Sequence, residues 1–336
     1  MINKKIKSFP KPTWFLRLGQ VFQHGDRPWR VLIVTVSILV ILLMVAIGGM
    51  LWKESSGARQ AFGWGFLFPT VNASWDPVKD HFQAWPFIYG TLLTSLLAII
   101  IALPVSLGIA IFLVELCPAW LRSPLTWLVE LLAAIPSVVY GLWGIFIFLP
   151  LIVTPFGNFL AETLGQIPWI GLLFSGPMPA SGSSRLAAGL ILAIMIIPTI
   201  AAITRDVFLA IPNSQREASL ALGSTLWETI GQVLIPYGLS GILGAVILGL
   251  GRALGETMAV TMVIGNSIEG SASILRPGYT MASVIANEFA EAVSKLHSEV
   301  LVEVGLVLFL MTLLLNILAR FLVWRVARRT PQEARA

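Results

Sequence analysis

The stretch REASLALGSTLWETIGQVLIP, residues 216–236, is a polar segment between two strongly apolar runs. Two helix-start patterns overlap it, Ser214-x-x-Glu217 and Thr225-x-x-Glu228, in which a hydroxyl and a carboxylate satisfy the free amides of a first turn. Gly223 lies between them, where a glycine can adopt the left-handed conformation that ends a helix. The pattern predicts a short helix, a turn at Gly223 and a second helix that leads to Pro236.

The composition around this segment is that of a membrane protein, with 57% hydrophobic and 12% charged residues. A bilayer core needs roughly 20 apolar residues per helix. The runs are continuously apolar rather than alternating, which favours helices over a barrel. We therefore predict an all-α integral membrane protein with about six transmembrane helices, near residues 30–52, 86–114, 123–151, 185–205, 236–265 and 300–324.

The net charge of +5 does not indicate nucleic-acid binding, because the basic residues sort by side of the membrane. They gather before the first run and after the last, so both termini are predicted to be cytoplasmic. The loops near 53–85, 152–184 and 266–299 are then extracytoplasmic. The expected organisation is a cytoplasmic segment (1–29), a first transmembrane helix (30–52), an outer loop (53–85), a core of five transmembrane helices (86–324) and a cytoplasmic tail (325–336).

A second polar cluster lies inside an apolar run, in GLGRALGETMAVTMVIGN, residues 249–266. Arg252 is a cation deep in a predicted span, and Glu256 follows one helical turn later, where the two could pair. Three interpretations stay open: a structural ion pair, a substrate pathway and a proton relay. A guanidinium donates in pairs to oxyanions, which favours an anionic substrate, and the Thr257 and Thr261 hydroxyls could add donors.

The spacing of Glu217, Ala218, Gly223 and Pro236 resembles the coupling motif of ABC importer permeases. Ser219, Val233 and Ile235 are conservative departures from that motif. Two further strings, ELLAAIPSVVYGLWG (130–144) and GRALGETMAVTMVIGN (251–266), resemble the membrane subunits of bacterial phosphate importers. The resemblance covers roughly residues 86–324.

The resemblance implies a type I ABC importer permease fold, in the inner membrane of a bacterium, whose cytoplasmic coupling helix binds an ATPase. It assigns Glu217, Ala218 and Gly223 to ATPase coupling, and places Arg252 and Glu256 on an intramembrane charged pair of the family. From the residues themselves we predict Arg252, Glu256 and Thr257 to line the substrate pathway. It also implies three kinds of partner: a homologous second permease subunit, an ATPase dimer and an extracytoplasmic phosphate-binding protein. The sequence holds no G-x-x-x-x-G-K-[ST] motif, so we expect ATP and magnesium to bind the ATPase and no cofactor to bind this chain.

Two other classes of function are weighed against this one. A secondary anion transporter would also explain Arg252, but it has no need of a capped docking helix. An intramembrane enzyme would need a nucleophile or metal cluster, whereas His24, His81 and His297 are scattered and Cys117 stands alone. We therefore predict neither catalytic residues nor a metal site. The aromatic residues of the outer loop 62–85 are expected to form an interfacial belt or a docking surface.

Overall fold

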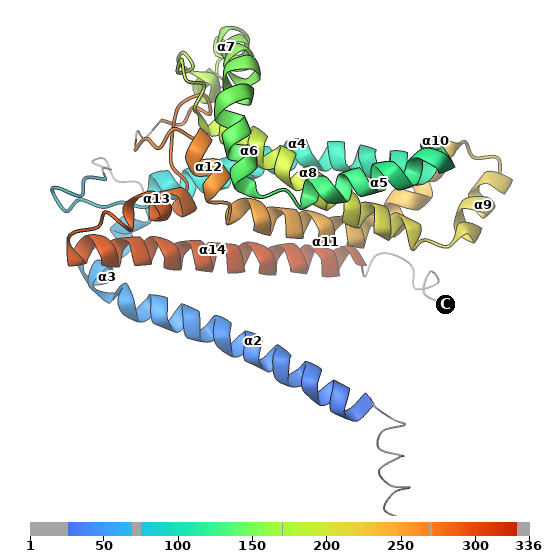
Figure 1. Cartoon of the computed structure of the whole chain (residues 1–336), viewed down its shortest axis with the longest axis horizontal. Coiled ribbons are helices and arrows are strands. Elements are labelled where there is room, and N and C mark those ends of the chain that lie inside the picture. Colours follow the sequence, from blue (N-terminus) through green and yellow to red (C-terminus); the bar gives the residue numbers. More distant parts are fainter. Residues whose placement is uncertain (1–25, 69–74, 170, 269–270, 328–336) are drawn as a thin grey trace, which may run out of the picture. The chain divides into compact units, whose positions relative to one another are not determined.

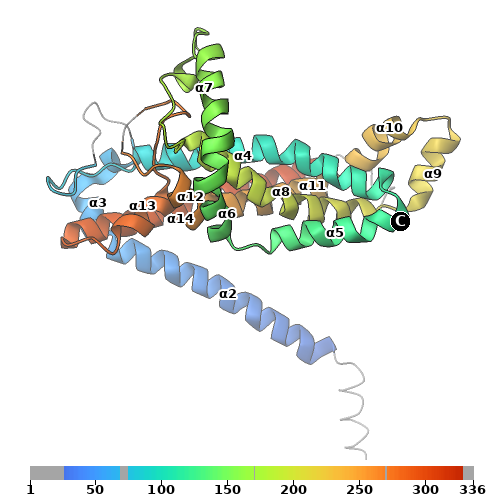
Figure 2. The ribbon, with the colours of Figure 1, turned by 45° about the horizontal axis from the view of Figure 1, so that its top comes forward.

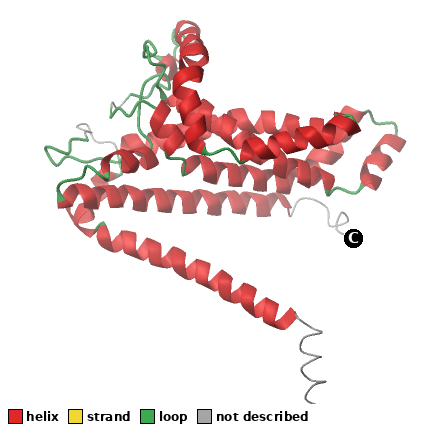
Figure 3. Cartoon of the chain, viewed as in Figure 1, coloured by secondary structure: helices red, strands yellow, loops and turns green. Residues whose placement is uncertain are grey.

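The computed structural model describes residues 26–68, 75–169, 171–268 and 271–327, and these are mostly helical (Figure 3). Within those ranges there is no strand, only isolated bridges between Asp76 and His81 and between Gly265 and Gly278. In the part of the chain that the structure describes, six helices are long and apolar enough to cross a membrane. The chain is thus an all-α, multi-pass membrane protein.

The chain divides into two units at Lys53 and Glu54. In the first unit the structure describes one element, α2 (Asp26–Glu54), which contains the predicted span 30–52. Most of the predicted N-terminal segment, residues 1–25, lies outside the described residues, as does the end of the C-terminal tail, 328–336.

The second unit is a bundle built around α8 (Arg185–Leu209), the most enclosed of the six spans. It packs along α4 (Trp85–Ile111) and α11 (Ile235–Leu254), and Figures 1 and 2 both show these helices side by side. Small residues such as Ala98, Ala188 and Ala245 are fully buried in the core and let the helices approach closely. The remaining long helix, α14 (Lys295–Ala327), packs against α11.

The third predicted span, 123–151, had the wrong bounds. The structure has α5 (Ala119–Ala133), a break, and then a membrane-length helix over Ser137–Thr163. Pro136 causes the break, because it has no amide hydrogen and disfavours helical geometry in the residue before it. With 15 residues, α5 is only about 22 Å long at ~1.5 Å per residue, too short to cross a bilayer.

The helix over Ser137–Thr163 consists of α6 (Ser137–Trp143), a π-helical segment, Gly144–Val153, and α7 (Thr154–Thr163). In both ribbon views it crosses the direction of α4 and α8 (Figures 1 and 2). Pro150 lies inside the π-helical segment.

The fifth predicted span, 236–265, is also interrupted. A continuous helix runs over Leu226–Leu254, made of α10 (Leu226–Thr229), a π-helical turn (Ile230–Leu234) and α11. A break at 255–257 separates it from the short α12 (Met258–Val263). The polar helix α9 (Asn213–Ala221) lies between α8 and α10.

The two ends of this bundle differ. One end carries α9 and α10, and we call it the α9 end. The other, the α13 end, carries α3 (Ser56–Phe62), α13 (Met281–Glu288) and the start of α14 (Figure 1). Short helices therefore form in segments predicted as outer loops. The aromatic side chains of the outer loop 62–85 do more than form an interfacial belt. Phe66, Trp75 and Phe82 are buried in a second hydrophobic cluster, separate from the one around α8.

Candidate functional site

The coupling element, residues 213–229, begins without the predicted first capping box. The N-cap of α9 is Pro212, and no side chain caps the helix. Because α9 starts at Asn213, Ser214 already lies in the first turn, too far along to serve as the cap. Glu217 is therefore an exposed helix residue, and its side chain makes no hydrogen bond or ion pair within the described part of the chain.

The turn after α9 is a Schellman motif. The Ser224 amide donates to the Ser219 carbonyl (3.3 Å), and the Gly223 amide donates to the Leu220 carbonyl (3.0 Å). Gly223 has a φ of +91°, which confirms the predicted left-handed conformation. Among the described residues, apart from its chain neighbours, a Cβ built on Gly223 would meet no atom within 4 Å, so the backbone angle, not crowding, requires glycine here.

The second helix of the element begins with the predicted capping box. The Thr225 amide donates to Glu228 Oε2 (2.7 Å), and the Glu228 amide donates to Thr225 Oγ1 (3.3 Å). Ser219, which replaces the second alanine of the motif, lies 3.0 Å from the Thr229 hydroxyl. That contact joins α9 to α10 across the turn.

The residues that carry the coupling motif are exposed to solvent. Glu217, Ala218 and Gly223 are all exposed. Beside them the apolar side chains of Leu222 and Trp227 are 89% and 66% exposed. An ordered turn with exposed apolar side chains is a surface suited to binding another protein.

One connection at the α9 end could not be read from the sequence. Arg216 Nε lies 2.9 Å from Glu115 Oε1, and both side chains are largely buried. Glu115 belongs to the π-helical turn Phe112–Leu116 that continues α4. The Arg216 guanidinium also donates to the Phe208 carbonyl in the last turn of α8 and to the Ile211 carbonyl just after that helix. Arg216 thus fixes α9 to the ends of α4 and α8, with a partner 101 positions earlier that no local pattern marks.

The second site lies around Arg252, in the last turn of α11. Its Nη1 donates to the Thr199 hydroxyl (3.2 Å) in α8 and to the Ala133 carbonyl (3.4 Å), the last residue of α5. A carbonyl at a helix C-terminus is an unpaired acceptor at the negative end of the dipole, which suits a cation. Arg252 therefore holds α5, α8 and α11 together.

The expected pairing of Arg252 with Glu256 is not formed. Among the described residues there is no ion pair between them, because the helix ends at Leu254 and the chain turns before Glu256. Glu256 Oε1 instead accepts the Ala259 amide (3.1 Å) in the first turn of α12. Thr257 and Thr261 each donate to a nearby backbone carbonyl. An i, i+4 pair requires one continuous helix, and here α11 ends at Leu254 with Gly255 as its C-cap.

In the part of the chain that the structure describes, no group of three or more His, Cys, Asp or Glu residues is placed to hold a metal ion.

Residues 102–331 match the family described as binding-protein-dependent transport system inner membrane component. The chain is 46% identical over 297 residues to a protein of Xylella fastidiosa (strain Temecula1) named phosphate transport system permease protein PstC, covering 88% of this chain and 89% of that one. The Haemophilus influenzae protein of the same name is 45% identical over 326 residues, or 97% and 98% of the two chains.

A solved structure shares the fold. It is a bacterial alginate ABC transporter in complex with an alginate pentasaccharide-bound periplasmic protein, with a TM-score of 0.59 and 14% identity, covering 91% of this chain and 98% of that one. The match to the family description spans most of the transmembrane core, and the identity to the named relatives extends over nearly the whole chain. The chain therefore belongs to the binding-protein-dependent transport system inner membrane component family, as an ABC importer permease of the PstC group.

Proposed function

We propose that this chain is the membrane-spanning permease subunit of an ATP-driven importer that carries inorganic phosphate across the inner membrane of a bacterium. The observation that carries the proposal is the coupling element, an ordered turn at Gly223. Beside it Leu222 is exposed, and Glu217 has no partner among the described residues, as expected of a surface that binds another protein. The choice of phosphate rests on the relatives named as phosphate transport permeases.

The partners follow from the same proposal. The coupling element binds one subunit of an ATPase dimer, and ATP and magnesium bind that dimer, since the printed sequence has no phosphate-binding loop. A homologous second permease subunit completes the membrane part. An extracytoplasmic phosphate-binding protein delivers the anion, as a periplasmic protein accompanies the alginate transporter of the same fold.

The anion path passes Arg252. Only its Nη1 is engaged, and Nε and Nη2 donate no hydrogen bond to any residue that the structure describes. Those two donors form the planar edge of the guanidinium that binds phosphate oxygens in pairs. The Glu256 and Thr257 side chains belong to the helix break that follows Arg252, where they can contact an anion that enters or leaves.

The proposed orientation places the α9 end and both termini in the cytoplasm. Val293 at the α13 end is 99% exposed and Leu222 at the α9 end is 89% exposed, so cysteines at these two positions are accessible. In a Cys117→Ala background without the ATPase, an impermeant thiol reagent added outside should label Val293→Cys. It should label Leu222→Cys only after the cells are permeabilised. Labelling of Leu222→Cys in intact cells would contradict the orientation.

The functional test uses the complete complex purified into lipid vesicles. We expect phosphate uptake that depends on ATP at the ATPase side and on the binding protein at the other side. Uptake driven by an ion gradient without ATP would favour a secondary transporter. ATP hydrolysis that is unaffected by phosphate-loaded binding protein would contradict the importer assignment.

A further inference from the structure

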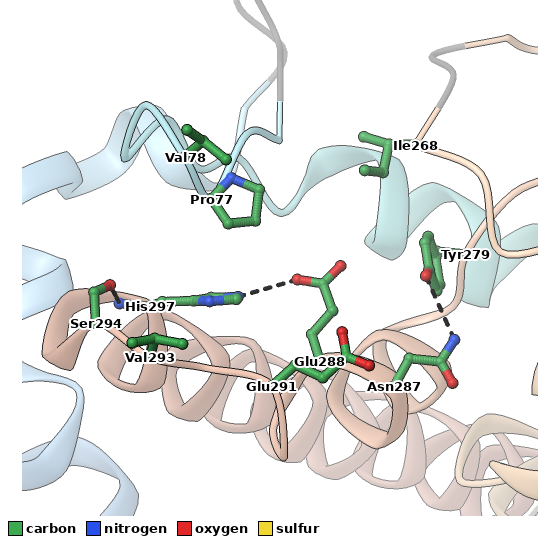
Figure 4. Close-up of a pocket in the computed structure, with 10 residues that line it drawn as sticks. All are labelled: Pro77, Val78, Ile268, Tyr279, Asn287, Glu288, Glu291, Val293, Ser294 and His297. Carbon is green, nitrogen blue, oxygen red and sulfur yellow. Dashed lines mark hydrogen bonds and ion pairs between the residues drawn. The ribbon is translucent and has the colours of Figure 1, made fainter.

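A cavity of about 710 Å³ opens at the α13 end of the bundle (Figure 4). The coupling element lies at the opposite end (Figure 1). Its walls come from the segment before α4, from the segment that leads into α13, and from α13 and the start of α14. We call it the outer pocket. None of its residues takes part in the Arg252 site or in the coupling element.

The outer pocket has a rigid carboxylate in its wall. Glu288 Oε2 accepts a hydrogen bond from Trp75 Nε1 (2.8 Å) and lies 3.0 Å from His297 Nε2. Trp75 packs edge-on against Phe82 and Phe87, and Phe82 stacks on the His297 ring. Both contacts use the same oxygen of Glu288. The other oxygen, Oε1, has no hydrogen-bond partner among the described residues and is not sealed from solvent.

The elements around Glu288 are themselves held in place. Thr280 caps α13 together with Ser283, and the Met281 amide donates to Thr91 of α4 (2.9 Å). A Cβ on Gly90 would overlap the carbonyl oxygen of Tyr279, so α4 and the segment before α13 are in close contact there. A carboxylate fixed in this way requires little further ordering when it binds a ligand.

The electrostatics of the outer pocket exclude an anion. Glu291 is a second carboxylate in its lining, and no Lys or Arg is among the lining residues. His297 is the one basic group there, and Glu288 already engages it. The pKa of the Tyr279 hydroxyl is raised, chiefly by burial; the hydrogen bond from Asn287 lowers it, and the nearby charges of Glu288 and Glu291 raise it further. Phosphate would be repelled from this cavity, and a cation would be attracted.

The mouth of the outer pocket is apolar. Val78 and Val293 are 92% and 99% exposed, and Pro77 and Ile268 also line the opening (Figure 4). An apolar rim above the carboxylates of Glu288 and Glu291 matches a long basic side chain, whose hydrocarbon stem contacts the rim while its charged head reaches the acids. A bound metal ion would need more ligands than two carboxylates supply, and the described residues offer no such group.

We propose that the outer pocket receives an arginine or lysine side chain of the extracytoplasmic binding protein. The proposal rests on the proposed function, which supplies that partner and places the α13 end outside. The basic side chain inserts between Val78 and Val293 and pairs with Glu288 Oε1 and with Glu291. Arginine is one of the residues that most often dominate the binding energy of protein interfaces.

The test measures ATP hydrolysis by the complete complex in lipid while the phosphate-loaded binding protein of the same transport system is titrated. Glu288→Gln and Glu291→Gln keep the side-chain shape and remove the charges. In the double variant we expect the half-maximal concentration of binding protein to rise at least about tenfold, equivalent to about 1.4 kcal/mol of binding free energy. Basal hydrolysis and the rate at saturating binding protein should stay at the wild-type values.

Glu162→Gln is the matched control, because Glu162 is an exposed carboxylate on α7 that does not line the outer pocket. It should leave the half-maximal concentration unchanged. The single variant Glu291→Gln controls for misfolding, because Glu291 is exposed and its replacement should not disturb the fold. It should show part of the rise in half-maximal concentration. Added salt should weaken the binding of wild type more than that of the double variant.

A wild-type half-maximal concentration in the double variant would overturn the role of the outer pocket and leave the proposed function intact. Failure of the binding protein to stimulate the wild-type complex at any concentration would contradict the proposed function itself, and the pocket proposal with it.

Discussion

The coupling element and the Arg252 site are built in opposite ways. Within the coupling element the hydrogen bonds are short in sequence: three positions separate Thr225 and Glu228, and ten separate Ser219 and Thr229. Arg252 instead binds Ala133 and Thr199, which are 119 and 53 positions away. The hydrogen bonds that shape the turn of the first site are local, while those of the second site depend on how three helices are packed.

This difference has a functional consequence. A locally stabilised, exposed turn can bind a partner as a rigid body and transmit force through it. A site that is made of several helices changes whenever those helices move, so it can exist in one conformation of a transport cycle and be dismantled in another. Substitutions in the coupling element should therefore act through the partner, and substitutions around Arg252 through the conformations of this chain.

The largest effect is expected from Gly223→Asp. A non-glycine residue at a φ of +91° is strained, at a cost of about 1–2 kcal/mol, and its side chain projects where the ATPase is proposed to bind. Phosphate uptake in lipid vesicles should be nearly abolished while the chain still inserts in the membrane. Gly65→Asp is the matched control, because Gly65 is also exposed and uncrowded but lies in the short helix Gly63–Phe66 at the α13 end. Normal uptake by Gly223→Asp would remove the coupling element from the mechanism.

Next in size is the effect of Arg252→Lys, which keeps the charge and loses the planar fork. We expect phosphate uptake to fall at least about tenfold, the size of one lost charged hydrogen bond of roughly 1.5 kcal/mol. Glu256→Gln should change uptake less, since Glu256 mainly caps α12. Because the two side chains do not pair, the double variant Arg252→Gln/Glu256→Gln should show the sum of the single effects in free energy. Substantial rescue in the double variant would restore the ion-pair interpretation.

A smaller effect is expected at the connection between the coupling element and the spans. Glu115→Gln removes the charge that faces Arg216, whose side chain is largely buried, and should destabilise the purified chain by about 1–3 kcal/mol. Glu130→Gln is the matched control, since Glu130 also pairs with an arginine, Arg205, but is half exposed, and it should cost less than about 1 kcal/mol. Thermal unfolding of the two variants in detergent makes the comparison. Equal destabilisation would mean that Glu115 is no stronger an anchor than a surface carboxylate.

The fold class was predictable because apolar runs of membrane length do not depend on tertiary contacts. The bounds of the third and fifth spans were not, because Pro136 and Gly255 can be tolerated within a membrane helix or can end it. In this chain they end it: α5 stops before Pro136, and α11 stops before Gly255. The choice between these outcomes depends on the packing of neighbouring helices.

The same distinction applies to the candidate sites: contacts between residues close in sequence were predictable, and contacts between distant residues were not. The turn at Gly223 and the cap at Thr225 were predicted correctly, because their partners are within a few residues. The first capping box was wrong, because Pro212 itself stands at the N-cap. Thr199, Ala133 and Glu115 could not be found, since nothing local marks an acceptor that a distant arginine will use. Their positions follow only from the packing of α4, α5, α8 and α11.

The binding of the coupling element to the ATPase is tested directly by where a photo-crosslinker at Leu222 attaches in the assembled complex. We introduce a benzoyl-phenylalanine at Leu222 and, in a second variant, at Val293, and identify the crosslinked protein by mass spectrometry. Leu222 should crosslink to the ATPase subunit, and Val293 should crosslink to the extracytoplasmic binding protein. Crosslinking of Leu222 to lipid, or to the extracytoplasmic protein, would contradict the central claim that the coupling element is where ATP hydrolysis acts on this chain.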